Sequence, residues 1–190
     1  MLFRSRKWLI FLLLSIASVA MSVQSFGDTM QERRVTISAS IFPRIIAVDE
    51  DLHKKLDGNE NIVLGLLYDS DKSKAENISS LLTRKIKKIA GHRIIIKLID
   101  INDNNLQQYN QLGGLLLIEP MSDTDVREIL DFSIQKQILC FSPFEGDIER
   151  GLMAGIFVGS KIQPYFNLKS IDKAKVKIKP ALLRVSKTYE

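Results

Sequence analysis

The sequence predicts an α/β fold, a three-layer sandwich built on a mostly parallel sheet. Four short apolar runs carry this prediction, at residues 62–68, 93–99, 114–118 and 137–141. Their hydrophobicity is continuous rather than alternating, which is typical of strands buried on both faces of a parallel sheet. Amphipathic stretches separate the runs, and this alternation of strands and helices favours right-handed crossovers.

Two helices are expected between these runs. After the first run, Ser73 and Glu76 form a capping-box pattern, and apolar residues then recur at helical spacing: Ile78, Leu81, Leu82, Ile86 and Ile89. After the third run, Ser122 and Asp125 open a second helix. The polar, Asn-rich segment 101–112 predicts a short or irregular crossover. Together these elements indicate a single Rossmann-like domain.

The flanking segments add further elements. Segment 35–56 is expected to be helical or mixed, with Pro43 breaking or starting a helix. Segment 155–162 is expected to be an extra strand. In segment 175–179, Val or Ile alternates with lysine, as in a half-buried strand, and Pro180 is placed to start a last helix. The prediction is therefore a sandwich with extra C-terminal strands and a helix.

Residues 1–22 are expected to be a secretory signal peptide. The chain opens with three basic residues, Arg4, Arg6 and Lys7. Residues 8–20 are then almost wholly apolar, and cleavage is expected near the small residues Ala20 and Ser22. A helix of about 13 residues rises only about 20 Å, short of the hydrocarbon core, so an uncleaved membrane anchor is the weaker alternative. Residues 23–190 would then form one periplasmic domain.

Charge is distributed unevenly along the chain. Three of the 27 Lys and Arg residues lie in the leader, and the others nearly balance the 22 acidic residues. The overall charge therefore gives no support to a nucleic-acid partner. From Gly151 onward, the sequence contains eight Lys or Arg residues and only two acidic residues, Asp172 and Glu190. This end of the chain is either a solvated lysine face or a docking surface for an acidic partner or anionic lipid headgroups.

Catalytic and metal-binding signatures are missing from the sequence. It contains neither a Gly-rich phosphate loop nor a Gly-x-Ser-x-Gly elbow. His53 and His92 lie in polar surroundings, and no set of His, Cys and carboxylate residues has zinc-site spacing. Cys140 is the only cysteine and lies in an apolar run, so a buried, inert thiol is expected. The sequence therefore predicts no catalytic residue, no metal and no cofactor.

Candidate binding residues lie where the predicted strands end. Ligands of doubly wound sheets sit at the carboxyl ends of the strands. Asp69 and Ser70 follow the first run, Glu119 follows the third and Ser142 follows the fourth. These side chains could hold a small polar ligand, although capping of turns and helices explains the same residue types.

The C-terminal half carries an ordered pattern of residues. Ser142 follows a strand, Gly151 and Gly155 surround a turn, and further matching positions are Phe157, Lys161, Ile162, Asn167, Leu182 and Leu183. In this order the segment resembles the YfiR/HmsC-like family of periplasmic proteins. The resemblance adds Lys161 and Asn167 to the candidate ligand- or partner-binding residues. Independently, Asn167 is suited to cap a following helix, and both glycines to a tight turn or a close backbone approach.

The resemblance implies a Rossmann-like regulator without enzymatic activity of its own. Such proteins act on an inner-membrane signalling protein, typically a diguanylate cyclase and in some lineages a histidine kinase, upstream of cyclic-di-GMP and biofilm formation. Better-known members carry paired cysteines, whereas this chain has only Cys140, so redox sensing is not transferred to it. The leading hypothesis is an exported regulator that docks onto the periplasmic domain of such a protein.

The alternative hypothesis is a periplasmic small-molecule binding module, similar to one lobe of a solute-binding protein. A chain of 190 residues holds only one such lobe, so clamping a ligand between two lobes would need a homodimer. The sequence leaves open whether the protein forms one.

Overall fold

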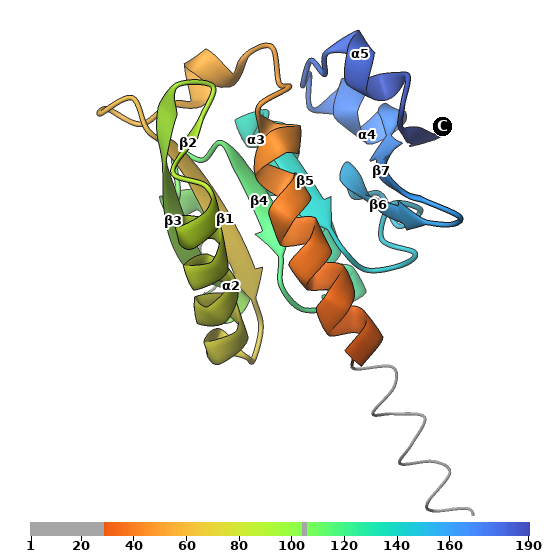
Figure 1. Cartoon of the computed structure of the whole chain (residues 1–190), viewed down its shortest axis with the longest axis horizontal. Coiled ribbons are helices and arrows are strands. Elements are labelled where there is room, and N and C mark those ends of the chain that lie inside the picture. The colour runs from red at the N-terminus through yellow and green to blue at the C-terminus, as the bar shows by residue number, and fades with distance from the viewer. Residues whose placement is uncertain (1–28, 104–105) are drawn as a thin grey trace, which may run out of the picture. The chain divides into compact units, whose positions relative to one another are not determined.

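The computed structural model describes residues 29–103 and 106–190 (Figure 1). The chain divides into two compact units, residues 1–34 and 35–190. Of the first unit, residues 29–34 are described, and they are helical. The predicted signal peptide and its cleavage positions lie outside the described residues. Within the two described ranges, no helix combines the length and apolar character needed to span a membrane.

The second unit is built on one sheet with the strand order β2-β3-β1-β4-β5-β6-β7-β8. Its strands are β1 (Ile62–Tyr68), β2 (Lys88–Ile89), β3 (His92–Asp100), β4 (Gly114–Leu117), β5 (Leu139–Ser142), β6 (Ala154–Val158), β7 (Ile162–Asn167) and β8 (Lys187–Tyr189). The strands β3, β1, β4, β5 and β6 are parallel to their neighbours in this series. The pairs β2·β3 and β6·β7 are antiparallel, and β8 is parallel to β7.

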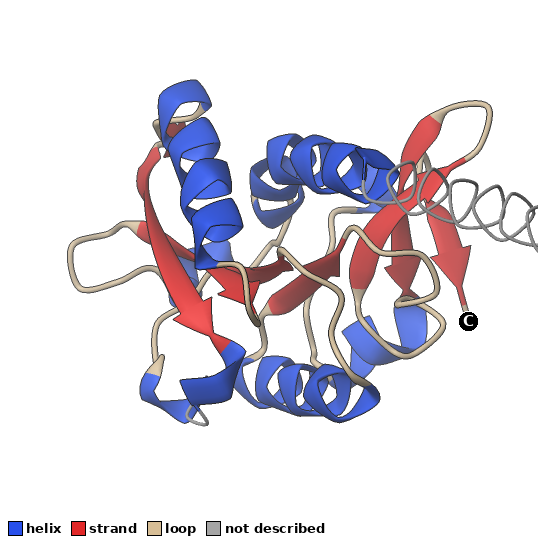
Figure 2. Cartoon of the chain, turned by 90° about the horizontal axis from the view of Figure 1, so that it is seen from below, coloured by secondary structure: helices blue, strands red, loops and turns tan. Residues whose placement is uncertain are grey.

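Helices cover both faces of this sheet (Figure 2). Helical residues 35–46 and α2 (Lys72–Lys85) lie on one face, whereas α3 (Asp123–Lys136) and α4 (Leu168–Lys173) lie on the other. Short helical turns complete the unit: η1 (Leu52–Lys55), η2 (Ile101–Asp103), η3 (Leu106–Gln108) and α5 (Pro180–Leu183). The predicted α/β sandwich with a mostly parallel sheet is confirmed, and η2 and η3 form the irregular crossover expected there.

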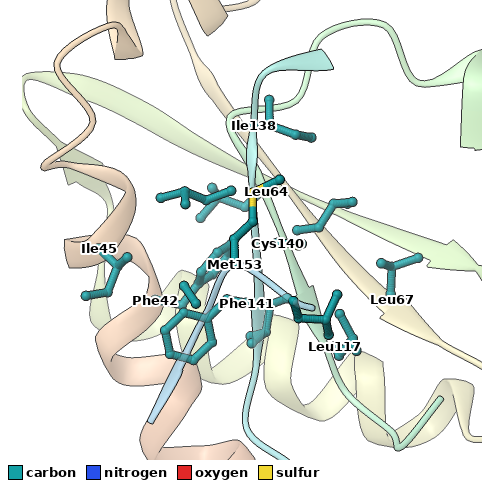
Figure 3. Close-up of a cluster of buried hydrophobic side chains, with 14 of the residues drawn as sticks. Phe42, Ile45, Leu64, Leu67, Leu117, Ile138, Cys140, Phe141 and Met153 are labelled. Atoms are coloured by element: carbon teal, nitrogen blue, oxygen red, sulfur yellow. The ribbon is translucent and has the colours of Figure 1, made fainter. Parts of the chain in front are cut away.

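The core lies along the central strands. Every residue of β4 and β5 is buried, as are six of the seven residues of β1. Figure 3 shows Phe42 of the N-terminal helical residues beside Phe141 of β5, with ring centroids 5.8 Å apart. Cys140 is fully buried nearby, as expected. In contrast, only Ile94 and Ile99 of β3 are buried, so the prediction that run 93–99 is buried on both faces is wrong.

Two helix boundaries differ from their predictions. The N-cap of α2 is Asp71, whose carboxylate accepts a hydrogen bond from Lys74 N at 2.8 Å, so the capping box predicted from Ser73 and Glu76 is wrong. The helix also ends at Lys85, because the chain turns extended at Ile86. In α3, the predicted capping box of Ser122 and Asp125 is present.

Pro43 neither breaks nor starts a helix. Helical residues continue through position 46, and Ala47 N donates to Pro43 O at 3.1 Å to close the last turn. Pro43 has no N–H to donate to the carbonyl of Ala39, so the helix continues there with one backbone hydrogen bond fewer.

Two C-terminal predictions also change. The extra strand expected at 155–162 is a hairpin, because β6 ends at Val158 and β7 begins at Ile162. Segment 175–179 forms only an isolated bridge, Asp49 to Ile178. Its lysines are exposed while its Val and Ile side chains are buried, so the solvated lysine face is confirmed for this segment. Pro180 starts α5 as expected.

Replacing Gly155 with Ala is expected to destabilise the fold. A Cβ there would lie 2.6 Å from the backbone oxygen of Ser142, so β6 would have to move away from β5. We expect a loss of about 1–3 kcal/mol in the free energy of unfolding, measured in urea. Gly58→Ala is the matched control, because a Cβ at Gly58 meets nothing within 4 Å. Equal stability of the two variants would contradict this explanation.

Candidate functional site

The topological switch point of the sheet lies between β1 and β4. The chain leaves β1 toward β3 on one side, whereas β4 continues the sheet on the other side. Loops that follow these two strands diverge, and ligands of doubly wound sheets bind in the resulting crevice. Of the predicted residues, Asp69 and Ser70 follow β1 and Glu119 follows β4. The structure brings these three residues together.

Glu119 fills the crevice with its own carboxylate. Its Oε2 accepts hydrogen bonds from the backbone N–H groups of three consecutive residues: Asp69 at 2.8 Å, Ser70 at 3.0 Å and Asp71 at 2.9 Å. Its Oε1 accepts from the Ser70 hydroxyl at 2.8 Å. The three N–H groups lead into α2, where the helix dipole also favours a negative charge. Glu119 thus occupies the position that an anionic ligand would take.

The environment of Glu119 keeps its carboxyl group ionised. Partial burial raises the pKa of Glu119, but the hydrogen bonds from the backbone of Asp71 and Asp69 and from Ser70 outweigh it. The net pKa therefore lies below the ordinary value of 4.5. The carboxylate links two loops that lie 48 to 50 residues apart in the sequence.

Asn102 extends this network to the end of β3. Its Nδ2 donates to both the backbone oxygen and Oδ1 of Asp69, each at 2.9 Å. Its own backbone N–H donates to Asp100 Oδ1 at 2.9 Å. The ends of β1, β3 and β4 are therefore connected by side chains of the chain itself, and the donors that could hold a ligand at the switch point are already used.

Ser142 belongs to a second polar cluster, at the end of β5, in which Ser142 and Asp147 are buried. Its hydroxyl donates to Asp147 Oδ2 at 2.5 Å and accepts from Phe144 N at 3.1 Å. Arg150 donates to Asp147 Oδ1 at 2.7 Å, to Asp123 Oδ1 at 2.6 Å and to the backbone oxygen of Met121 at 3.0 Å. Desolvation lowers the pKa of Arg150. Its hydrogen bonds to the carboxylates of Asp147 and Asp123 raise this pKa by more, so the net pKa lies above the ordinary value. The cluster holds loop 143–151 against the start of α3.

The two residues added by the resemblance lie in different surroundings. Asn167 is buried, and its Oδ1 accepts from Ser170 N at 3.0 Å, so it caps α4 as expected. Its Nδ2 donates to the backbone oxygen of Ile148 at 2.9 Å. Lys161 is exposed in the turn between β6 and β7 and forms no ion pair within the described residues. A binding role for these two residues and for Ser142 stays a prediction.

Sequence reasoning missed Asn102, Asp147 and Arg150. The only signal in the sequence was the spacing of Asp147 and Arg150, an acidic and a basic residue three positions apart in one loop. Burial raises the pKa of the Cys140 thiol to about 11, which is the environment of an inert thiol. Among the described residues, no group of three or more His, Cys, Asp or Glu side chains is arranged to hold a metal ion.

Replacing Glu119 with Gln tests the filled switch point. The amide carries no charge and keeps only one of the two acceptor oxygens, so the three N–H groups lose their charge-assisted hydrogen bonds, and we expect the free energy of unfolding at pH 7 to fall by about 1–3 kcal/mol. Because the folded-state pKa of Glu119 is lowered, its stabilisation is present above the ordinary carboxyl pKa and is lost as the pH falls through the folded-state value. The difference between variant and wild type is therefore expected to shrink in acid. Glu128→Gln is the control, because Glu128 is an exposed residue of α3. An equally large loss of stability in this variant would contradict the role assigned to Glu119.

Arg150 forms ion pairs with two carboxylates, and replacing each in turn compares the contributions of Asp147 and Asp123 to stability. The Asp147 side chain is 2% exposed, whereas that of Asp123 is 77% exposed. Asp147→Ala removes the only acceptor of the buried Ser142 hydroxyl proton and one of the two carboxylates bound by Arg150, so we expect a loss of about 1–3 kcal/mol. Asp123→Ala is expected to cost less than about 1 kcal/mol. Urea unfolding measures both, and similar losses would contradict the structural role of Asp147.

Solved structures with similar folds include a conserved domain protein from Vibrio cholerae O1 biovar El Tor, with a TM-score of 0.54 and 14% identity over 74% of this chain. Another is the ligand-free, open form of CD0873, a substrate-binding protein with adhesive properties from Clostridium difficile, with a TM-score of 0.50 and 15% identity over 74% of this chain. The chain spans 58% of the length of each. At these identities the likeness shows the fold alone. A search of curated protein sequences gave no match.

A family profile gives a more specific result. The profile of the YfiR/HmsC-like family matches residues 54–187, from just before β1 to the start of β8. The match covers more than half of the chain and includes Ser142, Gly155 and Asn167, on which the sequence resemblance rested. The chain therefore belongs to the YfiR/HmsC-like family.

Proposed function

We propose that the protein is an exported, non-enzymatic regulator that docks onto the periplasmic domain of an inner-membrane signalling protein, a diguanylate cyclase or a histidine kinase. The family match over residues 54–187 is the observation that carries this proposal, because the family is one of periplasmic regulators. Control of cyclic-di-GMP, and through it of biofilm formation, would follow from such docking. The regulator would act by binding one state of its partner more tightly than the other.

The chemistry of the described residues supports docking over catalysis. The Cys140 thiol is fully buried, with its pKa raised to about 11, and is poorly suited to act as a nucleophile. His53 is exposed, and His92 Nδ1 lies 2.8 Å from the backbone oxygen of Glu60. Neither histidine has the nucleophile and orienting acid that a catalytic base requires.

Because Glu119 already fills the switch point, docking through the protein surface is favoured over binding of a solute there. The backbone donors after β1 are bound by Glu119, so a solute would have to displace an ionised side chain of the protein. The alternative function, small-molecule binding, draws on the structural likeness to a substrate-binding protein and would need a different site. A groove of about 670 Å³ lies along α3, but its lining includes opposite charges, Arg127, Glu128 and Asp131, without a buried polar group that would orient a ligand.

Export is expected to be required for regulation. Deleting the protein should change cellular cyclic-di-GMP, or phosphorylation of the kinase substrate if the partner is a kinase, and the full chain should restore the wild-type level. The matched control is the same chain without residues 1–22, which should fold but not complement because it cannot reach the periplasm. Complementation by this control, or no change in either readout on deletion, would contradict the proposal.

A thermal-shift screen separates the two functions. A ligand present at 100 times its dissociation constant adds about 2.7 kcal/mol to the stability of a folded protein. For a regulator that acts by docking, we expect flat melting curves with amino acids, sugars, nucleotides and small anions. A reproducible stabilisation by one of these classes would instead favour the solute-binding function.

A further inference from the structure

Exposed apolar side chains concentrate at one end of the sheet. Four of the six large apolar side chains that are exposed among the described residues lie there: Val158 at 45%, Ile162 at 44%, Val185 at 61% and Tyr189 at 38%. They belong to the tip of the β6–β7 hairpin (158–162) and to the tail that contains β8 (184–190). We call these two segments together the β8 edge. In Figure 1 the tip of the β6–β7 hairpin projects at the right, below the C-terminus.

The two segments of the β8 edge are held together by specific contacts. Val158 and Ile162 are register partners across the hairpin. Gln163 Nε2 donates to the backbone oxygen of Val185 at 3.1 Å. Lys187 Nζ lies 3.6 Å from the ring centroid of Phe157 and 4.9 Å from that of Tyr165. The exposed side chains are therefore carried by an ordered surface and not by a loose tail.

The backbone of β8 offers unused hydrogen-bonding groups. In the sheet order, β8 is the last strand, and among the described residues it pairs only with β7. Proteins commonly protect such an edge with a lysine that points across it. The lysine of β8 is Lys187, and its ammonium lies over the rings of Phe157 and Tyr165 instead. Among the described residues, no further strand pairs with the outer side of β8.

The charge of the β8 edge favours an acidic partner over a second copy. Lys161, Arg184 and Lys187 lie on it, and none of them forms an ion pair within the described part of the chain. The acids nearby are Glu190 and Glu149, and Glu149 Oε1 accepts a hydrogen bond from the Tyr165 hydroxyl at 2.9 Å. A symmetric contact between two copies would bring these cations against one another, which is unfavourable.

Resting on the function proposed above, we propose that the β8 edge is the docking surface, and that it binds an extended segment of the partner's periplasmic domain that carries acidic and apolar side chains. The segment adds to the sheet as a further strand beyond β8. Backbone hydrogen bonds would supply affinity, and the exposed apolar side chains with the surrounding cations would select the sequence. The hairpin tip would contact the same segment or its neighbour in the partner.

Site-specific photocrosslinking in living cells tests the surface. A benzophenone side chain replaces Val185 in the full chain, and a second variant carries it at Ile95, an apolar residue of β3 that is 38% exposed near the opposite end of the sheet. We expect Val185 to give an adduct that mass spectrometry identifies as a membrane protein with a cyclase or kinase domain, at least tenfold more abundant than the Ile95 adduct. Adducts of equal abundance, or an adduct with a second copy of this chain, would overturn the surface assignment.

Charge and apolar substitutions provide a second measurement. Val185→Asp and Arg184→Glu are expected to reduce the crosslink, read from a benzophenone at Ile162, at least tenfold and to abolish complementation of the cyclic-di-GMP or phosphorylation phenotype. Ile95→Asp is the matched control and should leave both unchanged. Because all three side chains are exposed, circular dichroism and melting curves should match wild type and separate loss of docking from loss of folding.

The outcomes separate the two proposals. If deletion changes signalling but the β8-edge variants complement as well as wild type, the docking surface lies elsewhere and the proposed function stands. If deletion changes neither readout and no signalling protein is crosslinked, the proposed function fails and this inference fails with it. Binding of the wild type to phosphatidylglycerol vesicles, lost in Arg184→Glu, together with no protein adduct would identify the β8 edge as a membrane contact and overturn strand addition.

Discussion

Burial of the central strands on both faces is the constraint on which the rest of the structure depends. The chain has one cysteine, so no internal disulfide can support the fold, and packing of β1, β4 and β5 between two helical layers must do so. Interior strands of this kind have almost no room for polar side chains. Polar chemistry is therefore displaced to the strand ends and to the outer strands, where the switch point, the Arg150 cluster and the β8 edge lie.

At the switch point the same constraint explains why Glu119 matters. Three backbone N–H groups that point into one crevice at a helix start must be satisfied, by a ligand, by water or by the protein. The protein satisfies them with a carboxylate from the neighbouring loop. This makes the crevice part of the stability of the folded state. The protein thus fills with its own carboxylate a position that this fold commonly uses for ligands.

Local patterns in the sequence predicted the elements well, and long-range contacts poorly. Continuous apolar runs identified β1, β3, β4 and β5, although only β1, β4 and β5 are buried along their length. The caps at Ser122 and Asn167 were predictable because a cap needs only residues three positions apart. The contact of Glu119 with the loop after β1 spans about fifty residues and leaves no local pattern. The hairpin at 155–162 was misread because its turn interrupts an apolar run without proline, and only the antiparallel pairing of β6 with β7 reveals it.

The cations of the C-terminal half lie in two different surroundings. In segment 175–179 the Val and Ile side chains are buried and the lysines are exposed to water, which explains the alternation without a docking partner. The cations of the β8 edge are different, because they surround exposed apolar side chains and a strand that, among the described residues, is paired on one side only. Strand addition also suits a regulator thermodynamically, since a partner segment can pair with β8 only in conformations that release it. Such docking would stabilise those conformations alone, and unequal affinity for two states is the requirement for shifting an equilibrium.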